Sequence, residues 1–163
     1  MFITIISDVH DNLPNLKKCL DWCEKNKIAG LISCGDLANI ETLSYLAENF
    51  KGQIYLVKGN ADSYSEKEAK NFKNINYFGE TGEFKLEGKN IGICHWPYLI
   101  DKIIENKNCE IIFYGHTHKP WLAEKNGIKK INPGEMSGMF SLATFAVWNT
   151  ENDNLELKVL EKL

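Results

Sequence analysis

The sequence of 163 residues contains no arginine, because all 19 of its basic residues are lysines. A chain without arginine cannot use the bidentate guanidinium fork for phosphate, which leaves lysines, backbone amides and metal ions. The net charge of −3 also disfavours the clustered basic surface that binds the backbone of long nucleic acids. The composition therefore predicts that long nucleic acid is not a partner.

The sequence also lacks signs of disulfides and of membrane spans. Its five cysteines are an odd number with no CxxC pair, and its first residues enter a strand-like run without signal-peptide features. The longest apolar runs, such as 111–114, are far shorter than the roughly 20 residues that cross a bilayer. We therefore expect a reduced, cytoplasmic protein with no membrane partner.

The first half of the sequence alternates short apolar runs with helix-like segments. The predicted strands are 2–6, 30–34 and 53–57, and the predicted helices are 13–26, 40–50 and 65–72. Repeated β–α units of this kind predict a mainly parallel sheet with helices on its faces. The length suits one domain over residues 1–163.

The second half has a different pattern, and we expect most of its strands to be antiparallel. Its predicted elements are strands 83–87 and 91–94 around a turn at 88–90, a helix at 98–106, and strands 111–114, 120–124, 128–131, 142–148 and 155–160. Two stacked sheets with helices outside would give both halves one core. The expected fold class is α/β, a four-layer α-β-β-α sandwich of two mixed sheets.

Five predicted strands end in short polar segments that contain all four histidines. These segments are Ser7-Asp8-Val9-His10, Gly35-Asp36, Gly59-Asn60-Ala61-Asp62, Cys94-His95 and Gly115-His116-Thr117-His118. Ligands bind at the carboxyl edge of open α/β sheets, because loops converge there on a rigid frame. The segments together predict one functional site.

Each segment alone has a simpler interpretation. The segment at Asp8 and His10 could be a turn with a helix cap, and a lone histidine such as His95 is more often structural. His116 and His118 point the same way if they continue a strand, yet they could be an exposed pair. Coincidence at five strand ends is a poor explanation, so the combined pattern favours a functional site.

The ordered set resembles the calcineurin-like metallophosphoesterase superfamily, whose pattern is D-x-H, G-D, G-N, a histidine and G-H-x-H. The match spans nearly the whole chain, and Asn132-Pro133-Gly134 is most similar to the small phosphodiesterase branch of YfcE type. The retromer subunit of the same fold is also similar. The resemblance implies an enzyme that hydrolyses phosphodiesters with a hydroxide bridging two metal ions.

The resemblance also implies roles for individual residues. Asp8, His10 and His118 would hold the first metal, Asn60, His95 and His116 the second, and Asp36 would bridge them, with Asp36, Asn60 and His95 catalytic. Imidazole and carboxylate ligands suit manganese, with Ni, Zn, Fe or Co as substitutes. Two divalent ions, two aspartates and one hydroxide leave a single positive charge, which complements a diester anion.

The same assignment leaves no histidine free to protonate a leaving group. Ala61 stands where some superfamily members have a further histidine. We therefore predict a preference for aryl diesters over alkyl monoesters, since a good leaving group needs little acid assistance. The substrate is expected to be a small phosphate ester.

Three positions depart from the pattern of the branch: Asp11 and Glu135 replace a glycine and a serine, and Trp96 begins a turn that lacks glycine. All three line the expected substrate entrance. Trp96 could bind substrate together with Asn12 and Asn60, yet Trp96 could instead cover the core edge. Asn12 could equally act only as a helix cap.

Two other functions compete with the phosphodiesterase. The retromer subunit shows that the fold can serve as a non-catalytic scaffold, but a scaffold tolerates loss of ligands that this sequence retains. A metal-dependent nuclease would need a basic groove, which the charge disfavours. Apolar residues in the later strands also suggest a possible homodimer.

Overall fold

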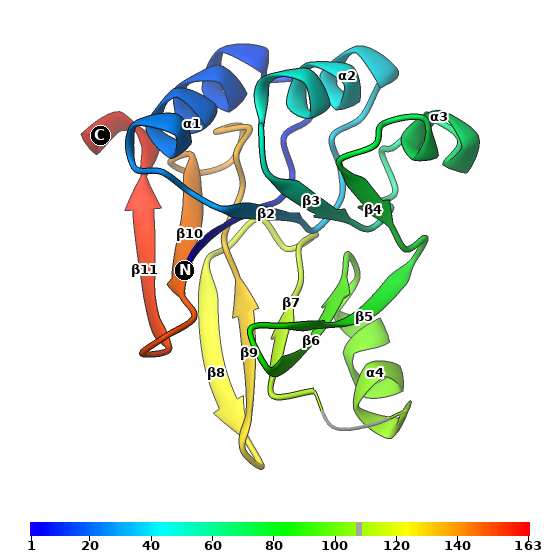
Figure 1. The fold of residues 1–163 in the computed structure, drawn as a ribbon, viewed down its shortest axis with the longest axis vertical. Helices are drawn as coiled ribbons and strands as arrows, with labels where there is room; N and C mark the ends of the chain where they lie inside the picture. The colour runs from blue at the N-terminus through cyan, green and yellow to red at the C-terminus, as the bar shows by residue number, and fades with distance from the viewer. Residues whose placement is uncertain (107–108) are drawn as a thin grey trace.

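The computed structural model describes residues 1–106 and 109–163 and contains two stacked β-sheets with helices on both outer sides (Figure 1). The expected four-layer sandwich is confirmed. The first sheet has the strand order β11-β10-β1-β2-β3-β4. Its strands are β1 Phe2–Ile6, β2 Gly30–Ser33, β3 Gln53–Leu56, β4 Ile75–Tyr77, β10 Thr144–Asn149 and β11 Asn154–Val159.

Three helices cover the outer face of the first sheet (Figure 1): α1 Leu13–Lys25, α2 Ile40–Asn49 and α3 Glu66–Lys70. Each begins at a polar cap, since Asn12, Asn39 and Ser65 accept hydrogen bonds from backbone amides of the first turns. Strands β1 to β4 run parallel, as expected from β–α units. The short strand β4 was not predicted.

The second sheet has the order β5-β6-β7-β9-β8 and carries α4 on its outer side (Figure 1). Its strands are β5 Thr81–Leu86, β6 Lys89–Cys94, β7 Ile111–Phe113, β8 Trp121–Lys125 and β9 Ile128–Asn132, with α4 at Ile100–Asn106 and 3-10 turns at Pro97–Leu99 and Leu160–Lys162. The second half of the chain is mostly antiparallel, as expected, because β5 pairs with β6, β8 with β9, and β10 with both β1 and β11 in antiparallel direction. Strand β7 pairs in parallel with both β6 and β9, because a helical crossover separates β6 from β7.

The hairpin of β5 and β6 turns one residue earlier than predicted. Leu86 pairs with Lys89, so Glu87 and Gly88 form the two-residue turn with φ of +48° and +84°. Positive φ at both central residues matches the twist of the flanking strands. The predicted turn at 88–90 therefore overlaps the start of β6.

The core lies in three layers that follow the stacking. Strand β1 is buried on both faces: Ile3 and Ile5 lie in the cluster between the two sheets, whereas Ile6 packs in the cluster beneath the helices. A third cluster joins Ile103 of α4 to Ile112 of β7. Burial on both faces explains why these strands are continuous apolar runs, and it gives the loops at their ends a rigid base.

The five cysteines are all buried and none forms a disulfide, in agreement with the odd count and spacing. Over residues 1–106 and 109–163, no helix has both the length and the apolar character needed to cross a membrane.

Candidate metal centre

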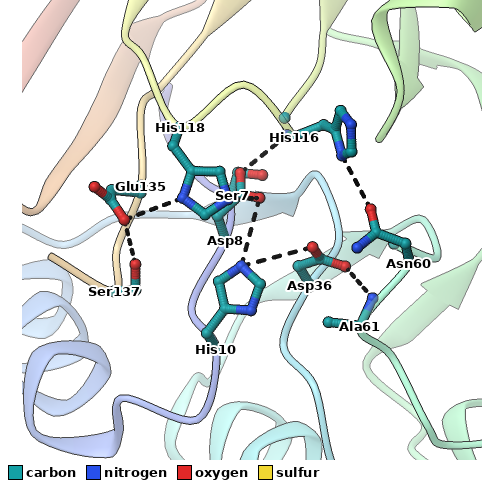
Figure 2. A network of polar contacts seen from close by, with 12 residues as sticks. Ser7, Asp8, His10, Asp36, Asn60, Ala61, His116, His118, Glu135 and Ser137 are labelled. Carbon is teal, nitrogen blue, oxygen red and sulfur yellow. Dashed lines mark hydrogen bonds and ion pairs between the residues drawn. The ribbon is translucent and has the colours of Figure 1, made fainter. Parts of the chain in front are cut away.

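The predicted site residues lie together where the carboxyl ends of β1, β2, β3, β6 and β7 meet between the two sheets (Figure 2). Backbone hydrogen bonds join the loops at this edge. Asp8 N donates to Gly35 O at 3.1 Å, and Gly115 N donates to His95 O at 3.1 Å. His116 N also donates to Asp8 Oδ2 at 3.1 Å, so one aspartate connects loops of both sheets.

The first group of candidate ligands surrounds one carboxylate oxygen. Asp8 Oδ1 lies 3.3 Å from His118 Nε2 and 3.9 Å from His10 Nε2. The two imidazole rings stack with centroids 5.2 Å apart. Among the described residues, Asp8 Oδ1 and His10 Nε2 are buried without a hydrogen-bond partner. Buried polar atoms of this kind need a partner, and a cation between them would supply it.

The second group centres on Asp36. Its Oδ2 lies 3.3 Å from His95 Nε2 and 3.6 Å from His10 Nε2, while its Oδ1 accepts a hydrogen bond from Ala61 N at 2.7 Å. The ligand atoms of Asp8, Asp36 and His95 lie within 4.8 Å of one another. Asp36 therefore faces both groups, the position that a bridging ligand needs. The donors present fit divalent metal ions.

Asn60 and His116 complete the set on the solvent side. Both residues are exposed, unlike the buried His95. Asn60 Oδ1 lies 3.1 Å from His95 Nε2 and 2.9 Å from His116 Nδ1 (Figure 2). All seven residues predicted as metal ligands thus lie within one cluster.

Five of these seven residues have left-handed backbone conformations. They are Asp8, His10, Asp36, His116 and His118, with φ between +46° and +69°. Residues other than glycine rarely adopt such angles, and each costs about 1 to 3 kcal/mol. Strained backbone at five residues of one candidate ligand set is typical of functional sites.

Glycines next to the ligands allow the close packing of these loops. A Cβ atom on Gly59 would lie 2.1 Å from Asp36 Oδ1, and one on Gly115 would lie 2.0 Å from Ser7 Oγ. Both distances are far below van der Waals contact. Glycine is therefore required before Asn60 and His116 for a steric reason.

The two aspartates among the candidate ligands, Asp8 and Asp36, have opposite pKa shifts. Burial raises the pKa of Asp8, although nearby histidines oppose this effect. Burial also acts on Asp36, but His95 and the amide of Ala61 outweigh it and hold the pKa of Asp36 below its usual value. Burial disfavours protonated His95, yet the two aspartates raise its pKa overall. The field of the site thus favours positive charge.

Two of the imidazoles are held by acceptors on their far side. His95 Nδ1 donates to Cys34 O at 2.8 Å, and His118 Nδ1 donates to Glu135 Oε2 at 3.1 Å (Figure 2). In each ring this contact leaves Nε2 facing an aspartate. Histidines that bind metals are commonly oriented in this way.

Asp62 supports the site in a way that the sequence did not reveal. Its carboxylate accepts hydrogen bonds from the amides of Gly59 at 2.7 Å, Ala38 at 2.9 Å and Asp36 at 3.1 Å. Burial raises the pKa of Asp62, although these amides oppose the shift. In the sequence, only its position two residues after Asn60 linked Asp62 to the site, and that position did not indicate a role.

The residues at the predicted entrance have clear contacts. Asn12 accepts from Asn15 N at 3.1 Å and donates to Ser137 O at 2.7 Å, which agrees with the cap interpretation. Asp11, at φ of +59°, accepts a hydrogen bond from Thr42 Oγ1 at 2.6 Å and so attaches the loop to α2. Trp96 is half-buried and lies edge-to-face with His95, with ring centroids 5.2 Å apart.

Fold and site together define a class, an α/β sandwich with candidate metal ligands at the carboxyl ends of strands from both sheets. Within this class the chain belongs to the calcineurin-like phosphoesterase superfamily, because residues 1–153 match the profile of that superfamily's domain. The predicted family is therefore confirmed.

Relatives and solved structures agree with this membership. The chain is 28% identical to phosphodiesterase MJ0936 of Methanocaldococcus jannaschii over 167 residues, which covers 99% of this chain and 100% of the relative. It is 23% identical to phosphodiesterase YfcE of Escherichia coli K12 over 156 residues, covering 84% and 80%. The structure of an archaeal phosphodiesterase superposes with a TM-score of 0.89 at 25% identity, covering 98% and 99%.

The fold is also shared with Vps29, a protein that is not named a phosphodiesterase. Vps29 of Entamoeba histolytica, solved with zinc, has a TM-score of 0.72 at 19% identity and 97% coverage of both chains. At this identity the similarity concerns the fold alone.

Proposed function

We propose that the protein is a phosphodiesterase that depends on two divalent metal ions. Membership of a phosphoesterase superfamily supports a hydrolase, and the relatives at 28% and 23% identity are both named phosphodiesterases. The observation that carries the proposal is the pair of candidate metal groups that share Asp8, one with His10 and His118 and one with Asp36 and His95.

The proposed ligand assignment follows the two groups. Asp8, His10 and His118 would hold the first ion, Asn60, His95 and His116 would hold the second, and Asp36 would contact both. When bound, such ions polarise a phosphate ester and lower the pKa of a coordinated water. Manganese is the proposed metal, with Ni, Zn, Fe or Co as substitutes, because imidazoles accompany the carboxylates.

The protein's own residues define which esters fit this proposal. Asn60 is neutral and exposed, so it adds a hydrogen-bonding amide beside the phosphate without adding negative charge. Ala61 contributes only its backbone amide, and that amide is bonded to Asp36. With all four histidines assigned to metals, we propose aryl diesters as better substrates than alkyl monoesters.

A non-catalytic scaffold is the alternative, because the Vps29 fold is similar. The complete ligand set and the strain concentrated on it favour the enzyme. A metal-dependent nuclease is the third candidate function, because the net charge of −3 disfavours binding of long nucleic acids. Small phosphate esters as substrates and a homodimer of this chain are part of the same proposal.

The test is hydrolysis of an aryl phosphodiester by chelator-stripped protein, with manganese, nickel, zinc or magnesium added back. Asp36→Asn is the control, since loss of the carboxylate proposed to contact both ions should lower turnover by roughly 1,000-fold. Activity restored by a transition metal and lost in the control supports the proposal. Absence of turnover with every metal, in protein shown to be folded, would make the scaffold the leading function.

A further inference from the structure

Glu135 is the most heavily bonded side chain beside the candidate metal centre. It is fully buried, and it follows Gly134 in the connection between β9 and β10. Its two carboxylate oxygens accept hydrogen bonds from Ser137 Oγ, Met139 N, Phe140 N, Ser141 N, Ser141 Oγ and His118 Nδ1. Every one of these partners acts as a donor, so the site is built for an ionised acceptor.

One side of Glu135 faces the first metal group. Oε2 accepts from His118 Nδ1 at 3.1 Å, and the opposite ring nitrogen, Nε2, lies 3.3 Å from Asp8 Oδ1 (Figure 2). Because Nδ1 carries the proton, the lone pair of a neutral imidazole is on Nε2, directed towards Asp8. The carboxylate thereby selects the tautomer that a metal ligand needs.

The other side of Glu135 holds the loop 137–141. The amides of Phe140 and Ser141 donate to Oε1 at 2.9 and 2.5 Å, and Met139 N donates to Oε2 at 3.2 Å. This anchoring places the ring of Phe140 edge-on to His118, with centroids 5.0 Å apart. Phe140 is 75% exposed, so backbone bonds rather than side-chain burial fix its place.

We propose that Glu135 is a positioning residue with two linked effects: it sets the tautomer and orientation of His118 for the first metal ion, and it fixes the loop that lays Phe140 against the same imidazole. The inference rests on the proposed function only in assigning His118 to a metal. A purely structural anchor would hold the loop without affecting the imidazole.

Glutamine distinguishes the two roles because it keeps the shape and loses one acceptor. The amide oxygen of Glu135→Gln can still accept from the amides of Phe140 and Ser141. Its NH₂ group then takes the place of Oε2, which faces His118 Nδ1 and Met139 N. It favours the His118 tautomer with the proton on Nε2, and that nitrogen then has no lone pair for a metal. Ser141→Ala is the matched control, since it removes one loop hydrogen bond and leaves the contact with His118 intact.

The experiment is calorimetric titration of cobalt into chelator-stripped wild type, Glu135→Gln and Ser141→Ala, with thermal unfolding of each metal-free protein. We expect the glutamine variant to bind the first ion roughly 10- to 100-fold more weakly and to show an altered cobalt absorption spectrum. The alanine variant should bind as the wild type does. Wild-type affinity and spectrum in Glu135→Gln, or an equal loss in both variants, would overturn the proposal.

A second measurement needs no variant at position 135, in case Glu135→Gln does not fold. Nuclear magnetic resonance of isotope-labelled histidine in the metal-free wild type, at alkaline pH, reports which ring nitrogen carries the proton. His118 is assigned by comparison with His118→Asn. The proton is expected on Nδ1, and a proton on Nε2 would refute the proposed role.

The outcomes separate this inference from the proposed function. If the wild type binds no transition metal, the metal-dependent phosphodiesterase fails, and the positioning role fails with it. If the wild type binds metal and hydrolyses the aryl diester while Glu135→Gln binds equally well, only the positioning role is wrong.

Discussion

The two halves of the candidate metal centre differ in how the chain prepares them for a cation. In the half around Asp8, two buried polar atoms have no hydrogen-bond partner among the described residues, and the supporting acceptor of His118 is a carboxylate. In the half around Asn60, the side chains already lie within hydrogen-bonding distance of one another, and the supporting acceptor of His95 is a backbone carbonyl.

This difference predicts unequal metal affinity. The first half offers a charged ligand and atoms that gain a partner when a cation binds, whereas the second half offers a neutral amide and must break existing contacts. Asn60 and His116 are also exposed, so water competes for them. We therefore expect the first ion to bind more tightly than the second.

The largest expected effect on metal binding comes from a change at the centre of the first half. Asp8→Asn removes a full negative charge from a buried site, and the first ion should bind about 100-fold more weakly or worse. Asn60→Ala should weaken the second ion by a smaller factor and leave one tightly bound equivalent. Metal analysis after gel filtration checks both. Equal losses in the two variants would show that the halves are not distinct.

A smaller effect is expected from making the halves alike. Asn60→Asp supplies a carboxylate to the second half and should tighten the second ion by about tenfold. The added negative charge also cancels the positive balance that favours a diester anion, so aryl diester turnover should fall. Titration and steady-state kinetics on the same preparation measure both quantities. Higher affinity together with faster turnover would contradict the charge argument.

The smallest effect concerns pH in the metal-free protein. Burial opposes ionisation of Glu135, but Ser137, His118 and loop amides lower its pKa from 4.5 to about 2. Its contribution to stability is therefore complete above pH 4.5 and is lost as the pH falls towards 2. The pKa of His95 is raised from 6.5, so its contribution is complete below 6.5 and is lost as the pH rises above that value.

The two halves should thus lose stability in opposite directions of pH. Urea unfolding of the metal-free wild type and Glu135→Gln across this range tests the acid limb, which should be shallower in the variant. An unchanged acid limb would mean that Glu135 keeps its ordinary pKa.

Much of the fold could be predicted because the inner strands are short apolar runs bounded by polar residues. Strand β4 escaped prediction since it has only three residues, one of them polar, and its pairing of Ile75 with Ile54 is what makes it a strand. The parallel pairing of β7 with β6 and β9 was not predicted, because strand direction depends on which strands become neighbours. A local pattern carries no information about neighbours.

The candidate site was predictable in its membership but not in its construction. Strand ends marked the ligands, since parallel strands place their carboxyl ends on one edge. The left-handed backbone at Asp8 and His116, and the hydrogen bond between them, could not be read from the sequence. The hydrogen bond joins positions that are 108 residues apart in the sequence.

By itself, the sequence determined the order of the elements, the residues at their ends and the family, because apolar periodicity and residue type are local properties. Only the tertiary structure decided that Asp62 supports the loop of Asp36 and that Glu135 joins His118 to the loop 137–141. Each of these roles needs a donor from another loop at hydrogen-bonding distance. The pairing of β2 with β3 and of β7 with β9 brings those loops together, and pairing between strands is a tertiary property.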